Sequence, residues 1–296
     1  MPYVRTITLT SLAMIAFAGN SLLCRAALQH TNIDAASFTT IRLASGALML
    51  WLIVVVRRGK YTGGGSWLSA FALFAYAAGF SFAYVSLSAA TGALLLFGAV
   101  QATMIGYGIW AGERLLKLQI VGLGLALTGL TGLLLPGLSA PPLYGSVLML
   151  GAGVAWGVYS LRGKAAGDPT AVTAGNFLRA VPIAAALSII TLNVSSLDTA
   201  GFGYAVTSGA LASGIGYAIW YTALPALKAT NAATVQLSVP VIAALGGVVI
   251  LGEPITFRLV LASVAILGGT ALVILDKEHV KSAQQIDPTD TENRRS

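Results

Sequence analysis

Charged residues are scarce in this sequence, and their scarcity argues against a soluble fold. Only 9% of the 296 residues are charged and 56% are hydrophobic, whereas soluble domains carry about 25% charged residues. Residues 66–112 and residues 118–161 contain no aspartate, glutamate, lysine, arginine or histidine. Each stretch is long enough for two membrane spans of about 20 residues. The sequence therefore predicts an all-α polytopic membrane protein, because a chain inside lipid must satisfy its own backbone hydrogen bonds.

Cysteine and histidine are also nearly absent. Cys24 is the one cysteine, which excludes an internal disulfide, and the two histidines, His30 and His279, form no cluster with metal-ligand spacing. The chain has no Gly-x-x-x-x-Gly-Lys phosphate loop. We therefore expect no metal, no cofactor and no ATP hydrolysis. The net charge of +7 is explained by loop residues that set membrane topology, so we expect no nucleic-acid partner.

Apolar stretches separated by short linkers predict ten membrane-spanning helices. We place them at residues 7–28, 34–56, 67–88, 92–111, 118–136, 143–162, 170–192, 202–224, 231–251 and 257–275. The start of the chain resembles a signal peptide, but its apolar run continues to Leu28, so we interpret it as the first span. Residues 276–296 are polar and mixed in charge, which predicts a disordered tail.

The two halves of the chain repeat one pattern. The pair Gly112-Glu113 closes the fourth span and Gly252-Glu253 closes the ninth, while Ala16-Phe17 has its counterpart in Ala155-Trp156. We therefore divide the chain into a first repeat at 1–138, a second at 139–275 and a tail at 276–296. An odd number of five spans per repeat predicts that the repeats have opposite orientations in the bilayer. Such inverted repeats around a central site are typical of alternating-access transporters.

Orientation follows from the basic residues. Most of the 17 lysines and arginines fall in the segments on one side of the membrane, and the loops on the other side hold only Arg25 and Arg258. Because positive loops stay inside, both termini are predicted to be cytoplasmic.

These features resemble a known family. Five plus five spans, an arginine early in the second span and Gly-Glu at the end of the fourth are similar to the drug/metabolite transporter superfamily, each half resembling an EamA-type unit. The run Phe97-x-x-Val100-Gln101-x-Thr103-Met104-Ile105 resembles the YddG-type aromatic amino acid exporters. The proline expected before Gly-Glu is present at Pro240 but missing near Val100. The resemblance implies ten helices around a cavity lined by spans one, three, four, six, eight and nine, in a bacterial inner membrane.

Aromatic and amide side chains in those spans are the candidate cavity residues. Aromatic rings with a few hydroxyl groups suit flat, weakly polar ligands such as aromatic amino acids. Packing within the membrane is the alternative for each aromatic residue, and hydrogen bonding between helices is the alternative for each polar one. The candidates are Phe17, Asn20, Tyr76, Phe80, Tyr84, Gln101, Trp156, Tyr159, Ser160, Tyr217, Trp220, Tyr221 and Gln236.

Two further groups have predicted roles. Gly98 and Pro240 are hinge candidates, because proline removes a backbone hydrogen bond inside a helix; a static kink is the alternative. Four charged residues are predicted to be structural, with the embedded arginines bonding loop carbonyls or the glutamates of the Gly-Glu pairs, and substrate contact as the alternative. These are Arg42, Arg179, Glu113 and Glu253.

The ten acidic residues all lie outside the span interiors, whereas proton-coupled carriers commonly bury a carboxylate. We therefore predict an exporter of aromatic amino acids or similar small molecules that works by facilitated diffusion, with the bilayer and its substrate as partners and a monomer as the expected state. The alternatives are a broader amino acid or drug exporter with proton coupling, a passive channel and a membrane-embedded enzyme. The enzyme has no evident acid–base group, so we predict that the chain is not an enzyme.

Overall fold

The computed structural model is helical throughout the part of the chain that it describes, residues 3–60, 63–112, 116–135, 137, 140–163, 168–227 and 235–286. Eight helices are long and apolar enough to cross a membrane. They are α1 (Tyr3–His30), α2 (Ala35–Arg58), α3 (Trp67–Tyr84), α4 (Ala89–Trp110), α5 (Lys117–Leu134), α6 (Leu143–Gly163), α7 (Pro169–Ile190) and α12 (Phe257–Ile286). This architecture agrees with the predicted all-α polytopic membrane protein.

The eighth and ninth predicted spans take a different form. A short 3-10 turn, η1 (Leu192–Val194), precedes α8 (Thr199–Thr207), the π-helix η2 (Ser208–Ile215), α9 (Gly216–Ala223) and the turn η3 (Leu224–Ala226). The run from α8 to α9 is continuous and covers most of the predicted span 202–224. The helix α11 (Ser238–Leu251) is apolar but shorter than the other spans. Residues 231–234 of the predicted ninth span lie outside the described residues.

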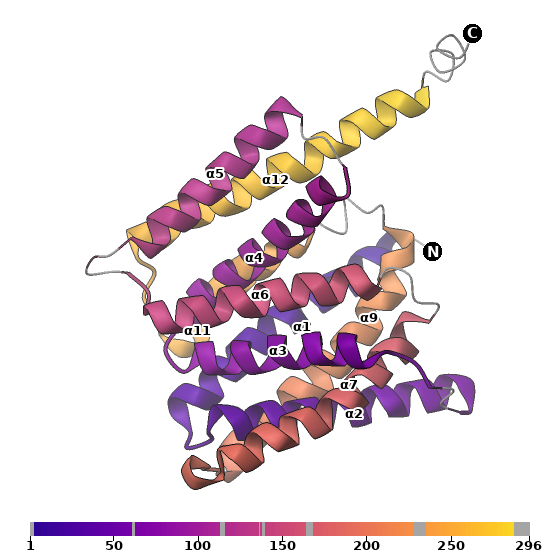
Figure 1. The fold of residues 1–296 in the computed structure, drawn as a ribbon, viewed down its shortest axis with the longest axis vertical. Coiled ribbons are helices and arrows are strands. Elements are labelled where there is room, and N and C mark those ends of the chain that lie inside the picture. Colours follow the sequence, from indigo (N-terminus) through magenta and orange to yellow (C-terminus); the bar gives the residue numbers. More distant parts are fainter. Residues whose placement is uncertain are drawn as a thin grey trace.

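The helices pack in pairs that join the two halves of the chain. α2 lies against α7, α3 against α6, and α5 against α12. The pair α5 and α12 forms one edge of the bundle (Figure 1). α4 also contacts α6, and α1 contacts α9 and α11. The buried core draws side chains from α1, α2, α3, α4, α6, α7 and α9, and its aromatic members include Tyr76, Phe80 and Phe177.

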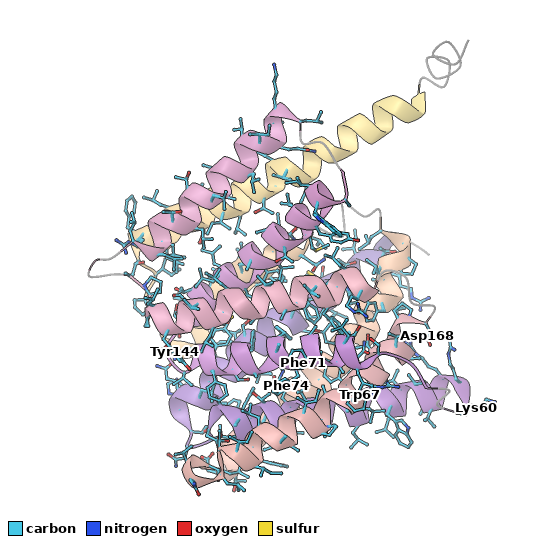
Figure 2. The ribbon with its side chains drawn as sticks, viewed as in Figure 1. Lys60, Trp67, Phe71, Phe74, Tyr144 and Asp168 are labelled. Carbon is cyan, nitrogen blue, oxygen red and sulfur yellow. The ribbon has the colours of Figure 1, made fainter. Side chains whose placement is uncertain are left out.

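The two ends of the bundle differ in the residues that they carry. Lys60 and Asp168 lie at one end and Tyr144 lies at the other, with α3 running between them (Figure 2). A salt bridge of 2.8 Å joins Arg58 to Asp168 at the first end. We refer to these as the Asp168 end and the Tyr144 end. Trp67, near the Asp168 end, is 62% exposed, as expected for a side chain that faces lipid or the interface.

Asp34 determines where α2 begins and ties the loop before it to the other half. One carboxylate oxygen accepts hydrogen bonds from the backbone N–H groups of Ala36 and Ser37, and the other accepts from Ser196 N at 2.9 Å. Burial raises the pKa of this carboxyl group, but the hydrogen bonds from Ser37, Ser196 and Ala36 outweigh it and lower the pKa below 3.8. The charged carboxylate therefore stabilises the folded state.

Asp34→Ala should lower the free energy of unfolding at pH 7 by about 0.5–2 kcal/mol, because a capped helix start loses its acceptor. A folded-state pKa below the unfolded value gives stability that is present above pH 3.8 and is lost as the pH falls further. The difference between wild type and Asp34→Ala should therefore shrink in acid. Thermal unfolding in detergent as a function of pH measures this, and Asp34→Asn, which keeps a capping oxygen, should retain most of the stability. Equal stability of Asp34→Ala and wild type at pH 7 would contradict the role.

Candidate functional site

A cavity of about 490 Å³ lies among α1, α3, α4, α6, α7, η2 and α9, so both halves of the chain contribute to it. It extends to Ser160, Pro169 and Leu227, which places it nearer the Asp168 end than the Tyr144 end. Its volume suits a small-molecule ligand. The lining residues that the structure describes are aromatic, apolar or neutral polar, and none of them is acidic or basic.

Aromatic rings form a continuous wall on one side of the cavity. Trp156 lies at its centre, with ring centroids 4.8 Å from Tyr76, 5.2 Å from Tyr159 and 5.4 Å from Tyr217. Tyr217 continues the wall to Phe17, at 5.5 Å. These separations are typical of favourable offset and edge-to-face pairs, each of which adds about 0.5–1.5 kcal/mol beyond burial. The rings therefore hold one another in place and present faces to a ligand.

A buried polar network borders the same cavity. The Ser208 hydroxyl donates to Asn20 Oδ1 at 2.6 Å, and Asn20 Nδ2 donates to the Tyr76 hydroxyl at 3.4 Å. This network joins α1 to α3 and to the start of the π-helix η2, a type of helix that is frequent at functional sites. The Ser160 hydroxyl donates to the Trp156 carbonyl within its own helix at 2.8 Å. The cavity thus combines aromatic faces with a few fixed hydrogen-bonding groups.

The structure brings every predicted cavity residue to this site except Tyr84. Tyr84 is fully buried between α3 and α4, where its hydroxyl donates to the Ala89 carbonyl at 3.3 Å. It shares a helical face with Phe80 but lies one turn nearer the Tyr144 end, beyond the cavity. Sequence reasoning missed several wall residues, although Phe97, Val100 and Met104 stood in the quoted family motif. The missed residues include Leu96, Phe97, Val100, Met104, Val172, Thr173 and Ser213.

Arg25 and Glu253 close the bundle at the Tyr144 end. The Arg25 Nε lies 2.9 Å from Glu253 Oε1, and the other carboxylate oxygen accepts from Ala89 N at 2.8 Å. Arg25 also donates to the Tyr84 carbonyl at 2.9 Å. One ion pair therefore links α1 and the end of α11 to the junction of α3 and α4.

The predicted structural charges have different partners. Arg179 donates to the carbonyls of Gly64 and Gly175, in agreement with a loop-bonding role. Glu253 is held by Arg25, so the predicted alternative of a bond from Arg42 or Arg179 to Glu253 is wrong. Glu113 lies outside the described residues. Arg42 is 2% exposed and its guanidinium lies over the rings of Tyr76 and Phe80.

The two hinge candidates, Gly98 and Pro240, differ in whether the helix around them is continuous. α4 runs through Gly98 without a break, and a side chain there would meet Ile266 at ordinary van der Waals distance. Pro240 lies in the first turn of α11, not in mid-helix, because the helix begins at Ser238. A helical segment at 235–236 precedes a turn at Leu237. The break is explained by Pro240, which has no N–H to donate to the Gln236 carbonyl.

Glu253→Gln should weaken the closure of the Tyr144 end, because it removes the negative charge that Arg25 faces. Cys24 is adjacent to Arg25 and is fully buried, so its alkylation by a maleimide reports opening of this end. We expect the alkylation rate of the purified protein to rise about tenfold or more, since the loss of a partly buried charge partner costs more than 1.4 kcal/mol. Asp168→Asn is the matched control: it breaks the ion pair at the other end. Equal rates of Cys24 alkylation in Glu253→Gln and Asp168→Asn would contradict the role of Glu253 in closing the Tyr144 end.

Comparisons with known proteins agree with this architecture. Residues 143–275 match the model of the EamA-like transporter family. The chain is 59% identical over 275 residues to an uncharacterized protein of Pseudomonas aeruginosa, which covers 93% of this chain and 96% of that protein. It is 35% identical to the threonine/homoserine exporter RhtA of Salmonella typhimurium over 168 residues, about half of each chain at 53% and 56%. A solved crystal structure with 18% sequence identity superposes with a TM-score of 0.65 over 91% of this chain and 97% of that one, a likeness of fold alone.

Proposed function

We propose that the chain, whose residues 143–275 match the EamA-like transporter family, is a drug/metabolite transporter that exports small amphipathic metabolites, with aromatic amino acids as the preferred substrates. The observation that carries the proposal is the aromatic wall centred on Trp156, in a cavity whose described lining residues are uncharged. Stacking on such rings favours a flat aromatic side chain. Asn20, Gln101 and Gln236 in the same lining supply hydrogen-bonding groups for the polar end of the substrate.

A second candidate substrate class is small hydroxy amino acids. The similarity to RhtA, which is named as a threonine and homoserine exporter, favours this class over the matching half of the chain. The same cavity would hold a smaller side chain with fewer ring contacts. The two classes are therefore compared directly in the transport experiment below.

We also propose that the halves 1–138 and 139–275 are inverted repeats that transport by alternating access, with 276–296 as a tail. The helix pairing supports a twofold relation, since α3 packs on α6 as α1 packs on α9, and α4 packs on α6 as α1 packs on α11. With cytoplasmic termini in an inner membrane, the cavity lies toward the inside and the Arg25–Glu253 pair closes the outside. An impermeant maleimide added to intact cells should then reach Cys24 in Glu253→Gln. Labelling that requires permeabilised cells would contradict this orientation.

Counterflow in liposomes tests the function. Vesicles preloaded with unlabelled tryptophan should accumulate labelled tryptophan transiently and saturably. Trp156→Ala should raise the half-saturating concentration about tenfold, because it removes a stacking face for the substrate and the ring that holds Tyr76, Tyr159 and Tyr217 in place. The matched control is Trp67→Ala, which removes an exposed ring on α3 and should leave transport unchanged.

The same vesicles separate the alternatives. Counterflow with threonine but not with tryptophan would replace the aromatic preference by the hydroxy amino acid class. Flux that does not saturate would indicate a channel. Absence of flux with every small metabolite tested would favour the alternative of a membrane-embedded enzyme. Accumulation of tryptophan driven by a pH gradient alone would contradict facilitated diffusion.

Pro240 is proposed as a hinge for the movement of α11, because the helix is already broken at Leu237 beside it. Pro240→Ala restores a backbone donor and should slow counterflow several-fold while leaving tryptophan affinity within about twofold of wild type. The control is Pro182→Ala, since Pro182 lies inside α7 and does not line the cavity. Unchanged exchange rates in Pro240→Ala would remove the hinge. We propose no comparable break at Gly98, where α4 is continuous.

A further inference from the structure

Among the residues that the structure describes, Arg42 is a buried cation without a salt-bridge partner. Its side chain is 2% exposed, and neither Nε nor Nη1 has a hydrogen-bond partner. Within the described part of the chain, the two salt bridges join Arg25 to Glu253 and Arg58 to Asp168. Arg179, its counterpart in the second half, donates to two carbonyl groups. Since buried charges are normally paired and hydrogen-bonded, Arg42 has donor groups available for an anion.

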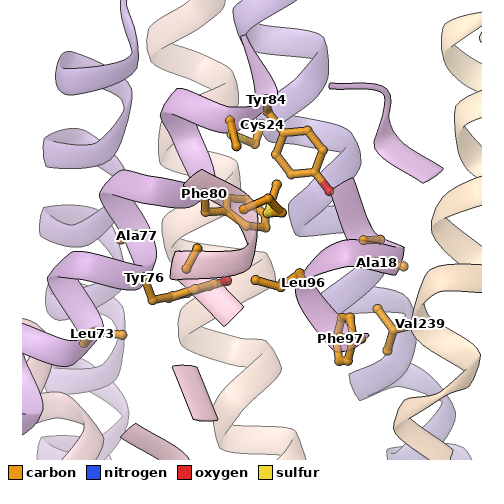
Figure 3. Packing of buried hydrophobic residues seen from close by; sticks show 14 of the residues in the cluster. Ala18, Cys24, Leu73, Tyr76, Ala77, Phe80, Tyr84, Leu96, Phe97 and Val239 are labelled. Atoms are coloured by element: carbon orange, nitrogen blue, oxygen red, sulfur yellow. The ribbon is translucent and has the colours of Figure 1, made fainter. Parts of the chain in front are cut away.

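The position of Arg42 is directly behind the cavity wall. Its guanidinium carbon lies 5.3 Å from the ring centroid of Tyr76 and 4.8 Å from that of Phe80, and both rings line the cavity. Figure 3 shows these two side chains one turn apart on α3, with Cys24 and Tyr84 beyond them toward the Tyr144 end. The two rings stabilise the cation through their faces. The Tyr76 hydroxyl is an oxygen acceptor beside the cation, yet Nε and Nη1 have no hydrogen-bond partner.

The surroundings favour a carboxylate as the ligand. Among the described lining residues none is charged, and the Arg42 guanidinium lies against the Tyr76 and Phe80 side of the wall. An anionic group is attracted there and a cationic group is repelled, with little screening inside the bundle. The planar guanidinium fork also matches the geometry of a carboxylate, which it can bind through two parallel hydrogen bonds.

We propose that Arg42 is the subsite for the substrate carboxylate, reached between Tyr76 and Phe80, while the aromatic wall holds the apolar part of the substrate. Access to Arg42 requires the Tyr76 ring to move, which breaks its hydrogen bond of 3.4 Å from Asn20 and its ring contact with Trp156. The inference rests on the proposed export function and names the chemical group that the site selects. It places the substrate's carboxylate at the deep end of the cavity, beside Asn20.

Binding measurements with acid and amide pairs test the subsite. The purified protein is titrated with tryptophan and tryptophan amide, and with threonine and threonine amide. Wild type should bind an acid about 10- to 100-fold more tightly than its amide, the range for hydrogen bonds to a charged partner. Arg42→Met should weaken binding of the acid until its affinity equals that of the amide. The affinity for the amide itself should stay within about twofold of the wild-type value. Arg42→Lys keeps the charge without the fork and should retain part of the preference.

Controls separate this role from a structural one and from failure of the proposed function. Arg179→Lys should keep the wild-type ratio of acid to amide affinity. If Arg42→Met weakens acid and amide equally, or if wild type does not discriminate between them, the subsite is wrong even where counterflow succeeds. Discrimination within the threonine pair alone, lost in Arg42→Met, would keep the subsite and overturn the aromatic preference. Binding of none of the four compounds by folded wild type would overturn both. If Arg42→Met does not fold, the wild-type ratio and Arg42→Lys decide.

Discussion

Close approach between helices at glycine is the constraint on which the rest of this structure depends. Lipid tails are as apolar as leucine, so helices in a membrane associate through tight packing instead of a hydrophobic driving force. A Cβ atom on Gly129 would lie 2.6 Å from Ala265 Cβ, and one on Gly153 would lie 2.6 Å from Ala99 Cβ. One on Gly209 would overlap the Arg42 carbonyl oxygen. These contacts fix the pairs α5–α12, α4–α6 and α2–η2 and leave no room for a larger residue.

The cavity follows from where these contacts occur. Because η2 touches α2 at Gly209, the adjacent Ser208 hydroxyl reaches Asn20, and Asn20 in turn reaches Tyr76. α4 and α6 meet at Gly153 and again at Gly157, where a Cβ atom would lie 2.8 Å from Thr103, while the Trp156 ring lies among large aromatic rings. Small residues of α6 therefore set its distance from α4, and the aromatic residue beside them lines the cavity.

The helical period of a sequence predicts on which face of a helix a residue lies. It does not predict how far along the helix the cavity extends. Tyr76, Phe80 and Tyr84 share a face, yet Tyr84 is covered where α4 returns from the Tyr144 end. Val172 and Thr173 were missed because nothing in their chemistry separates a cavity residue from a packing residue. The Arg25–Glu253 pair joins positions 228 residues apart, a contact that no local pattern contains. The helical membrane architecture, by contrast, follows from composition and the length of apolar runs.

The energetics of Arg42 explain how the protein can hold an unpaired cation. Inserting an arginine at the centre of a membrane helix costs about 2.5–3.5 kcal/mol on translocon scales. Each desolvated cation–π contact returns about 0.5–2 kcal/mol, and Arg42 makes two, with Tyr76 and Phe80. The two contributions nearly cancel, so the cation is stable without a carboxylate from the protein. Hydrogen bonds from Nε and Nη1 are then not used in folding, and they stay available as binding energy for a ligand that carries the anion.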